Sequence, residues 1–341
     1  SNLTDGSKTI TAFSKDYAGN LSSASTAITV RIDTDNPNTP TIPDLLDSDD
    51  HGFSNIDNKT NDIQPSFIAA GLSNISRDHV QLLLNNSVYY SGYISQISTD
   101  TLQVNTLLNA DKYLASIVVT DSAGNISDTS NALTVFIDDI PPSIPTTPDL
   151  ILSKDTGESS SDNITNDPIP TLVTTNLESG SIMKLFAISS VIDTTQIAVD
   201  TVAAAGSDIT LTSTTTLSDD TYTFYYTSED TAGNQSESND LTGVRIDTDE
   251  PTASIVPSDS LVRMEDSPVI TVTFNDVMTV NPQIAVDFAG ADDLATTDMT
   301  NTANDSIWTY DLTIPDGNDG TATVSIIGTD IAENALTNAN T

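Results

Sequence analysis

The chain has 341 residues and a formal net charge of −39, from 49 acidic and 10 basic side chains. This charge repels phosphate and anionic lipid, which argues against nucleic acid and membrane surfaces as partners. The chain has no cysteine, which excludes disulfides and thiolate metal sites, and its two histidines are too few for a histidine-rich zinc or iron site. No apolar run reaches the roughly 18–20 residues that a membrane-spanning helix needs, so we expect no membrane insertion.

The acidic residues are almost all of one kind, since only 7 of the 49 are Glu. General solubility could use either acid, so the excess of Asp needs a local cause. Asp favours turns and is a common oxygen ligand of calcium. The sequence also lacks an initiating Met and a signal segment, and we therefore expect it to be a piece of a longer protein.

Three sequence markers recur in one order along the chain. The first is Asp-x-Ala-Gly-Asn, which begins at Asp16, Asp121 and Asp230, with a degenerate copy at Asp330. The second is a short apolar strand that ends in an acid at Asp33, Asp138 and Asp247. The third is Pro-Asp-Leu followed by an Asp-rich stretch, which begins at Pro43 and Pro148. Markers that keep one order and one spacing predict tandem modules of about 105 residues.

The modules follow one another in the chain. Residues 1–35 carry only the last two strands, F and G, of a first module. The next module runs over 36–139, with strand A near 41–46, B near 65–70, C near 80–85, short strands through 87–104, F at 112–120 and G at 132–138. In strand F, Tyr113, Ala115, Ile117 and Val119 share one face. Alternation of this kind, with turn residues every 8–12 positions, predicts a β-sandwich.

The third module, residues 140–250, repeats the pattern, and the segment 251–341 diverges from it. In that segment we expect strands B at 270–274, C at 284–288, E at 306–314 and F at 320–327, a tight turn at 316–320, and no last strand G. The alternation of Trp308 with Tyr310 and Leu312 predicts a core tryptophan. The predicted fold is therefore all-β: immunoglobulin-like sandwiches in tandem, arranged end to end as a rod with stiff, proline-rich linkers.

The topology of such a sandwich brings the three markers together. The F–G loop lies at the pole where the chain enters a module, and the A–B loop lies at the pole where it leaves. Acids from both loops and from the linker therefore meet at each junction. At the first junction these are Asp33, Asp35 and Asp121, with Asp16 at the same place in the preceding marker. At the second they are Asp50, Asp57, Asn58, Asp138, Asp139, Glu178 and Asp230. At the third they are Asp155, Asp162, Asn163, Asp247, Asp249, Asp276 and Asp330.

Clustered carboxylates without a basic partner repel one another, and a divalent cation relieves the repulsion. Calcium (Ca2+) accepts 6–8 oxygen ligands in flexible geometry, whereas magnesium demands a tighter octahedron. Loops from two modules and a linker suit calcium better. The alternative is that Asp, Asn and Gly only form turns. A paired-carboxylate hydrolase is the one catalytic class that the composition could support, but the acids recur in every module, so we expect no enzyme. His51 and His79 occur in one module only and are interpreted as surface residues.

The markers resemble the tandem bacterial immunoglobulin-like repeats of giant secreted adhesins, the biofilm-associated and RTX adhesin group. The resemblance rests on the linker acid followed by Pro, on Pro-Asp-Leu, Asp-Thr-Gly and Asp-Asn-Ile-Thr, and on Asp-x-Ala-Gly-Asn. It implies a secreted, cell-surface extender between a membrane anchor and distal binding domains, with calcium stiffening the junctions and neighbouring repeats of the same chain as partners. The adhesion ligand would lie outside this segment, and the chain would be monomeric. Three positions depart from the pattern: Glu333 replaces Gly, Ser73 stands in the place of Glu178, and Ile140 in that of Asp35.

Two other functions stay open. One is a binding module, in which a sandwich face or the divergent segment 251–341 grips a polysaccharide or a protein. An exposed aromatic platform would favour it, but aromatic residues make up only 5% of the chain and the cores consume most of them. The other is a subunit of a surface layer or appendage, in which an incomplete terminal module accepts a strand from a neighbour.

Overall fold

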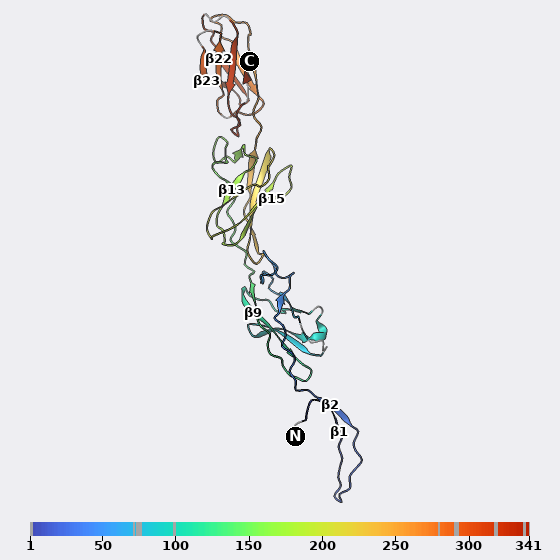
Figure 1. Ribbon diagram of the computed structural model, residues 1–341. Coiled ribbons are helices and arrows are strands. Elements are labelled where there is room, and N and C mark those ends of the chain that lie inside the picture. Colours follow the sequence, from blue (N-terminus) through green and yellow to red (C-terminus); the bar gives the residue numbers. More distant parts are fainter. Residues whose placement is uncertain are drawn as a thin grey trace. The chain divides into compact units, whose positions relative to one another are not determined.

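The computed structural model describes residues 3–70, 72, 77–97, 100–278, 280–289, 293–316, 320–336 and 339–340. The chain forms two compact units, residues 1–141 with the segment 229–234, and residues 142–228 with 235–341. Among the described residues, the elements are strands apart from one 3-10 turn, η1 (Ile94–Gln96) (Figure 1). This confirms the predicted all-β class. In the part of the chain that is described, no helix has the length and apolarity required to cross a membrane.

Residues 3–35 form an antiparallel hairpin. Its strands are β1 (Gly6–Ile10) and β2 (Ile28–Ile32), paired from Gly6 opposite Ile32 to Ile10 opposite Ile28. The first marker lies in the connection between them, and the linker acids Asp33 and Asp35 follow β2 directly. The hairpin thus delivers the linker acids at the end of a strand.

Residues 36–139 form a two-sheet sandwich. One sheet has the order β4-β10-β9-β6-β7 and the other β3-β5-β8. The strands are β3 (Asp44–Leu45), β4 (Lys59–Thr60), β5 (Ser66–Ile68), β6 (His79–Leu84), β7 (Ser87–Tyr93), β8 (Thr101–Gln103), β9 (Asp111–Thr120) and β10 (Leu133–Ile137). Alternate residues of β6 and β9 are buried against Phe67 and Leu102 of the smaller sheet, so both sheets share one core. The predicted face Tyr113, Ala115, Ile117 and Val119 belongs to this core.

Residues 142–250 repeat the sandwich. Its sheets have the orders β12-β19-β17-β14-β15, with β18 beside β17, and β11-β13-β16. The strands are β11 (Asp149–Leu150), β12 (Ile164–Thr165), β13 (Thr171–Thr174), β14 (Ile182–Ile188), β15 (Thr195–Thr201), β16 (Ile209–Thr212), β17 (Asp220–Glu229), β18 (Gln235–Glu237) and β19 (Leu241–Ile246). Tyr222, Phe224 and Tyr226 of β17 are buried and alternate with the less buried Thr223, Tyr225 and Thr227.

The segment 251–340 is a third sandwich of two four-stranded sheets, β20-β21-β25-β24 and β23-β22-β26-β27. Its strands are β20 (Ala253–Pro257), β21 (Val269–Phe274), β22 (Gln283–Phe288), β23 (Leu294–Asp298), β24 (Thr300–Asn304), β25 (Ile307–Asp311), β26 (Ala322–Ile327) and β27 (Ala339–Asn340). Trp308 lies in its core, as predicted. The predicted turn at 316–320 falls mostly on residues outside the described part.

The structure differs from the predicted strands in two places. A last strand does occur in the segment 251–341, because β27 pairs antiparallel with β26. Two residues in an Asn- and Thr-rich stretch give no apolar alternation to detect. In the A–B loops, where no strand was predicted, β4 and β12 pair in parallel with β10 and β19. These pairings fix the Asp-rich stretch of each A–B loop against the strand that leads into the linker.

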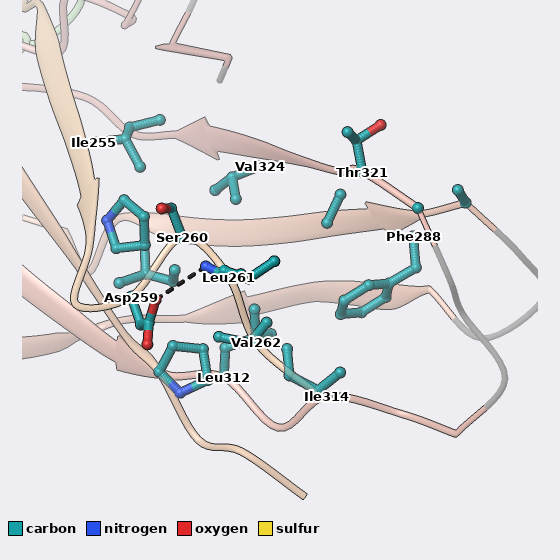
Figure 2. A pocket seen from close by; sticks show the side chains of 16 residues that line it. Ile255, Asp259, Ser260, Leu261, Val262, Phe288, Leu312, Ile314, Thr321 and Val324 are labelled. Atoms are coloured by element: carbon teal, nitrogen blue, oxygen red, sulfur yellow. Dashed lines mark hydrogen bonds between the residues drawn. The ribbon is translucent and has the colours of Figure 1, made fainter. Parts of the chain in front are cut away.

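An apolar cavity of about 340 Å³ opens at one end of the third sandwich, lined by side chains that include Ile255, Leu261 and Leu312 (Figure 2). The cavity coincides with a difference between the sandwiches at one sequence position. Tyr113 and Tyr222 each stand eight residues before the Asp of the first marker, and both are buried in their cores. Ala322 holds that position before Asp330 and lines the cavity. By this spacing, a residue that lines the cavity stands in the place that a buried tyrosine holds in the other two sandwiches.

Candidate metal centres

The Asp-x-Ala-Gly-Asn marker folds into the same loop in every copy, which we call the marker loop. In the third copy, Oδ1 of Asp230 accepts the amides of Ala232 (2.8 Å) and Asn234 (3.0 Å), and its Oδ2 accepts Nδ2 of Asn234 (2.8 Å). Asp121 and Asp330 make the same three bonds. The side-chain bond from Asn lowers the pKa of Asp16 and of Asp121 below the ordinary value. The acid therefore first serves to fold its own loop.

The last residue of the marker ties the loop to the linker of the preceding module. Nδ2 of Asn125 donates to the backbone carbonyl of Asp33 (3.1 Å), Nδ2 of Asn234 to that of Asp138 (2.7 Å), and Nδ2 of Asn334 to that of Asp247 (2.9 Å). These asparagines were not among the predicted site residues. The signal was present, because Asn closes all four copies of the marker, including the copy in which Glu333 replaces Gly.

The first acid cluster consists of Asp5, Asp33 and Asp35, whose ligand atoms lie within 4.8 Å of one another. Asp78 and Asp121 line the same hollow as Asp33 and Asp35. Asp33, Asp35 and Asp121 were predicted here, whereas Asp5 and Asp78 were not. Asp5 stands before β1, outside the three markers, so its approach to the linker depends on the pairing of β1 with β2.

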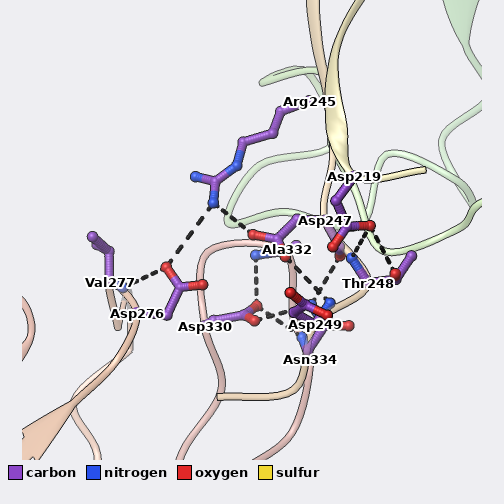
Figure 3. Close-up of polar contacts among 10 residues, drawn as sticks. All are labelled: Asp219, Arg245, Asp247, Thr248, Asp249, Asp276, Val277, Asp330, Ala332 and Asn334. Carbon is purple, nitrogen blue, oxygen red and sulfur yellow. Dashed lines mark hydrogen bonds and ion pairs between the residues drawn. The ribbon is translucent and has the colours of Figure 1, made fainter. Parts of the chain in front are cut away.

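The third acid cluster consists of Asp247 from the linker, Asp276 from the B–C connection and Asp330 from the marker loop, again within 4.8 Å of one another (Figure 3). Asp247 and Asp330 are buried. Burial raises the pKa of Asp247, and the carboxylates of Asp276 and Asp330 raise it further, while Arg245 opposes them. All three acids were predicted for this junction.

The prediction that the acids have no basic partner is wrong at the first and third clusters. Nη2 of Arg31 lies 3.1 Å from Oδ2 of Asp33. Nη2 of Arg245 lies 2.6 Å from Oδ2 of Asp247 and 4.0 Å from Oδ1 of Asp276. Each arginine lies in a strand, and its linker acid follows two positions later, directly after the strand ends. Side chains two positions apart along a strand lie on the same face, so the arginine and its acid are neighbours.

The second acid cluster consists of Asp138 and Asp139 from the linker and Asp230 from the marker loop. It is joined by the bond from Asn234 to the carbonyl of Asp138. Asp230 is buried, and Oδ1 of Asp138 accepts the amide of Ile140 (3.1 Å). Within the described ranges, the acids here do not form a group of three as compact as the other two.

The A–B loop acids form separate pairs. Asp50 is buried, accepts the amides of Asn58 (3.1 Å) and Lys59 (3.2 Å), and has a raised pKa because of that burial. The carboxylate of Asp57 raises this pKa further and accepts the same Lys59 amide (3.2 Å). Asn58 adopts φ +59, a left-handed conformation that Asn tolerates better than most residues.

The module 140–250 repeats this pair with Asp155 and Asp162. Asp155 is 4% exposed, and burial raises its pKa, with the neighbouring Asp162 adding to the shift. Asn163 follows with φ +60. In the described part of the chain, the buried Oδ1 of Asp155 accepts no hydrogen bond. A buried carboxylate oxygen without a partner, next to a second carboxylate, fits the requirements of a bound cation.

The A–B loop also contacts the marker loop of the following module. A Cβ on Gly52 would lie 2.8 Å from the carbonyl carbon of Thr231, and one on Gly233 would lie 2.8 Å from the amide nitrogen of Gly52. Next to this contact the amide of Asn61 donates to the carbonyl of Ala232 (3.1 Å). At the third cluster Oγ1 of Thr156 donates to the carbonyl of Ala332 at the same distance.

Of the other predicted site residues, Asp16 and Glu178 lie apart from these groups. Asp16 bonds to Asn20 within its own loop. Asp249 is exposed at the third cluster, where its amide donates to Oδ1 of Asp247 (3.4 Å) (Figure 3). Glu178 is exposed, and its carbonyl accepts the hydroxyl of Ser181. Ser73, which holds the place of Glu178 one module earlier, lies outside the described residues. The histidines make local contacts: Nδ1 of His51 is 2.6 Å from Oδ1 of Asn61, and His79 packs edge-on against Tyr93.

Comparison with known proteins gives matches of two kinds. A family described as bacterial Ig-like domain matches residues 36–139 and 142–248. Comparison with curated proteins gives no match. Among solved structures, a tetra-tandem repeat in the extending region of a large adhesion protein is 17% identical, covering 99% of this chain and 82% of that chain at a TM-score of 0.33.

Two further structures are similar at the same level. A structure from a 1.5-MDa bacterial ice-binding adhesin is 18% identical, covering 81% of this chain and 87% of that chain at a TM-score of 0.29. Fibronectin(III)-like modules of CbhA from Clostridium thermocellum are 15% identical, covering 54% and 86% at a TM-score of 0.34. The family match alone extends over more than half of the sequence, and the chain belongs to the bacterial Ig-like domain family.

Proposed function

We propose that the chain is a calcium-stiffened extender segment of a large bacterial cell-surface adhesin. The observation that carries the proposal is the repeated junction: three times, a marker-loop Asn bonds to the carbonyl of a linker Asp beside gathered carboxylates. Such a device, repeated in every module, serves the connection between modules. The extending-region repeat among the similar structures supports the same role.

Calcium is the cation that suits these groups. The ligands on offer are carboxylate and backbone carbonyl oxygens from flexible loops, which calcium accepts at coordination numbers of 6–8. Asp247, Asp276 and Asp330 would hold one ion, and Asp155 with Asp162 would hold another. Each marker-loop carboxylate keeps lone pairs free for an ion after it has bonded to its own loop, because an ionised carboxylate offers about four acceptor sites.

The mechanism follows from the charges. Without a divalent cation the gathered acids at a junction repel one another. At the third cluster, where Asp247 and Asp330 are buried, salt screens this repulsion poorly. The modules are then held by the linker, by the marker-loop bonds and by the contacts of the A–B loop with the marker loop. With calcium bound, each junction is fixed, and the modules form a stiff spacer that projects distal binding domains from the cell. The chain is secreted, is monomeric and has no catalytic activity of its own.

The test combines shape and stability in solution. Small-angle X-ray scattering and melting followed by circular dichroism are measured in chelator, in magnesium and in millimolar calcium. We expect the maximum dimension and the melting temperature to rise in calcium alone, since a ligand at a hundredfold excess over its Kd stabilises the folded state by about 2.7 kcal/mol. Identical scattering and melting in chelator and in calcium would reduce the acid clusters to ordinary turns.

A further inference from the structure

The three junctions fall into two classes that differ in one strand position. In β19, the amide of Arg245 donates to the carbonyl of Asn163 (2.9 Å), and in β10 the amide of Phe136 donates to the carbonyl of Asn58 (2.9 Å). The identical backbone bonds show that Phe136 and Arg245 hold equivalent places, two positions before the linker acid. Arg31 holds this place in the first cluster. The guanidinium of the first and third clusters is thus replaced by a phenyl ring at the second.

A second set of contacts divides the junctions in the same way. After the linker acid, Thr34 donates its amide and hydroxyl to Asp5 (3.1 and 2.8 Å), and Thr248 donates both to Asp219 (3.0 and 2.7 Å). At the second junction Asp139 replaces this threonine. The first and third clusters therefore each have an arginine guanidinium, and a linker threonine that bonds to an Asp. The second cluster has neither and carries one more acid.

We infer that Arg245, and Arg31 in the first cluster, act as tethered competitors of the bound cation. The inference rests on the proposed function. The guanidinium lies between Asp247 and Asp276, where it neutralises part of the charge that an ion would otherwise neutralise. The third cluster therefore stays together in chelator, and it binds calcium more weakly, since the ion must displace an ion pair.

The second cluster depends on the free cation. Within the described residues, neither Asp138 nor Asp139 forms an ion pair with a Lys or Arg side chain. Phe136 is 42% exposed, with the ammonium of Lys112 6.0 Å from its ring. The segment therefore contains junctions of graded calcium dependence: the second loosens first as calcium falls, and the two with arginine loosen later.

The first test uses a probe that reports on one module. Trp308 is the chain's single tryptophan and lies in the core of 251–340, which supplies Asp276 and Asp330 to the third cluster. Its fluorescence is followed during melting of the full chain and of Arg245→Met, in chelator and at increasing calcium. Arg263→Met is the matched control, because it removes the same charge from an exposed pair with Asp266 outside the clusters.

We expect Arg245→Met to lower the melting temperature in chelator and to give a larger calcium-induced rise than the natural chain. The calcium concentration at half of that rise should fall about tenfold, which corresponds to about 1.4 kcal/mol. Arg263→Met should change neither quantity. An equal loss of stability in chelator and in calcium would show an ordinary ion pair and overturn the inference.

The second test compares the second and third junctions in one chain by hydrogen exchange of the marker-loop amides. Calcium should increase protection most at 229–234 and less at 329–334, and Phe136→Arg should raise the protection of 229–234 in chelator and reduce the calcium effect there. Equal calcium effects at both loops in the natural chain would overturn the inference. No calcium effect at any loop would instead overturn the proposed function, which is a separate and recognisable result.

Discussion

At the scale of single residues, turn formation and metal ligation are compatible roles of the same Asp. Asp230 folds its own loop through three hydrogen bonds and still faces the linker through Asn234. The glycine before that asparagine has φ +91, and Gly124 in the preceding copy has φ +96. Glu333 adopts φ +68 at the same place, which a side chain tolerates only at a cost.

The two glycines give a matched pair of variants. Gly233→Ala places a Cβ against the backbone of Gly52, whereas Gly124→Ala meets nothing within 4 Å. Both variants carry the strain of positive φ, about 1–3 kcal/mol, but only Gly233→Ala must also separate two backbones. We therefore expect Gly233→Ala to lower the free energy of unfolding by more, by roughly a further 1–3 kcal/mol. Denaturant melts compare the two, and equal losses would contradict the Gly52 contact.

At the scale of elements, the sequence predicts what depends on local pattern. The alternation of Tyr222, Phe224 and Tyr226 is enough to place a core strand, and three such repeats are enough to predict tandem sandwiches. The parallel strands β4 and β12 could not be found this way, because each has two residues in a polar stretch and a partner more than 70 positions away. The pairing of Arg245 with Asp276 was missed for a related reason, since its partner comes from another module.

The cavity in the third sandwich gives a prediction at this scale. Ala322→Phe restores an aromatic ring where Tyr113 and Tyr222 stand in the other sandwiches. Full burial of a phenylalanine side chain contributes about 1.5–3 kcal/mol, and imperfect packing reduces this, so we expect a gain of about 1 kcal/mol. Melting followed by Trp308 fluorescence measures it, with Ala295→Phe on the exposed side of β23 as the control. A loss of stability would mean that the cavity cannot admit a ring.

At the scale of the whole molecule, the dominant property is a net charge of −39. Burial raises the pKa of Asp50, Asp155 and Asp247, one acid in each A–B loop and one in the third cluster, above the ordinary 3.8. The folded chain therefore disfavours the ionised form of these three acids. The same three groups must be ionised to bind a cation, so protons and calcium compete for them.

The last prediction follows from the sign of these shifts. A carboxyl whose pKa is higher in the folded chain than in the unfolded chain costs stability as the pH rises through the folded value. In chelator, the melting temperature should therefore rise as the pH is lowered from neutral toward the ordinary value of 3.8, because these carboxyls take up protons more readily in the folded chain. The pKa values of Asp16 and Asp121 are lowered, so their opposite effect appears only below 3.8.

In calcium the order reverses, because protonation removes the ionised ligands, so the calcium-induced rise in melting temperature shrinks as the pH is lowered over the same range. Asp247→Asn separates the two effects, since it removes one titrating group and one ligand together. The variant should melt at a higher temperature than the natural chain in chelator at neutral pH, and should gain less from calcium. A melting temperature in chelator that falls on acidification over this range would show that repulsion among the buried carboxylates does not limit the stability of the calcium-free chain.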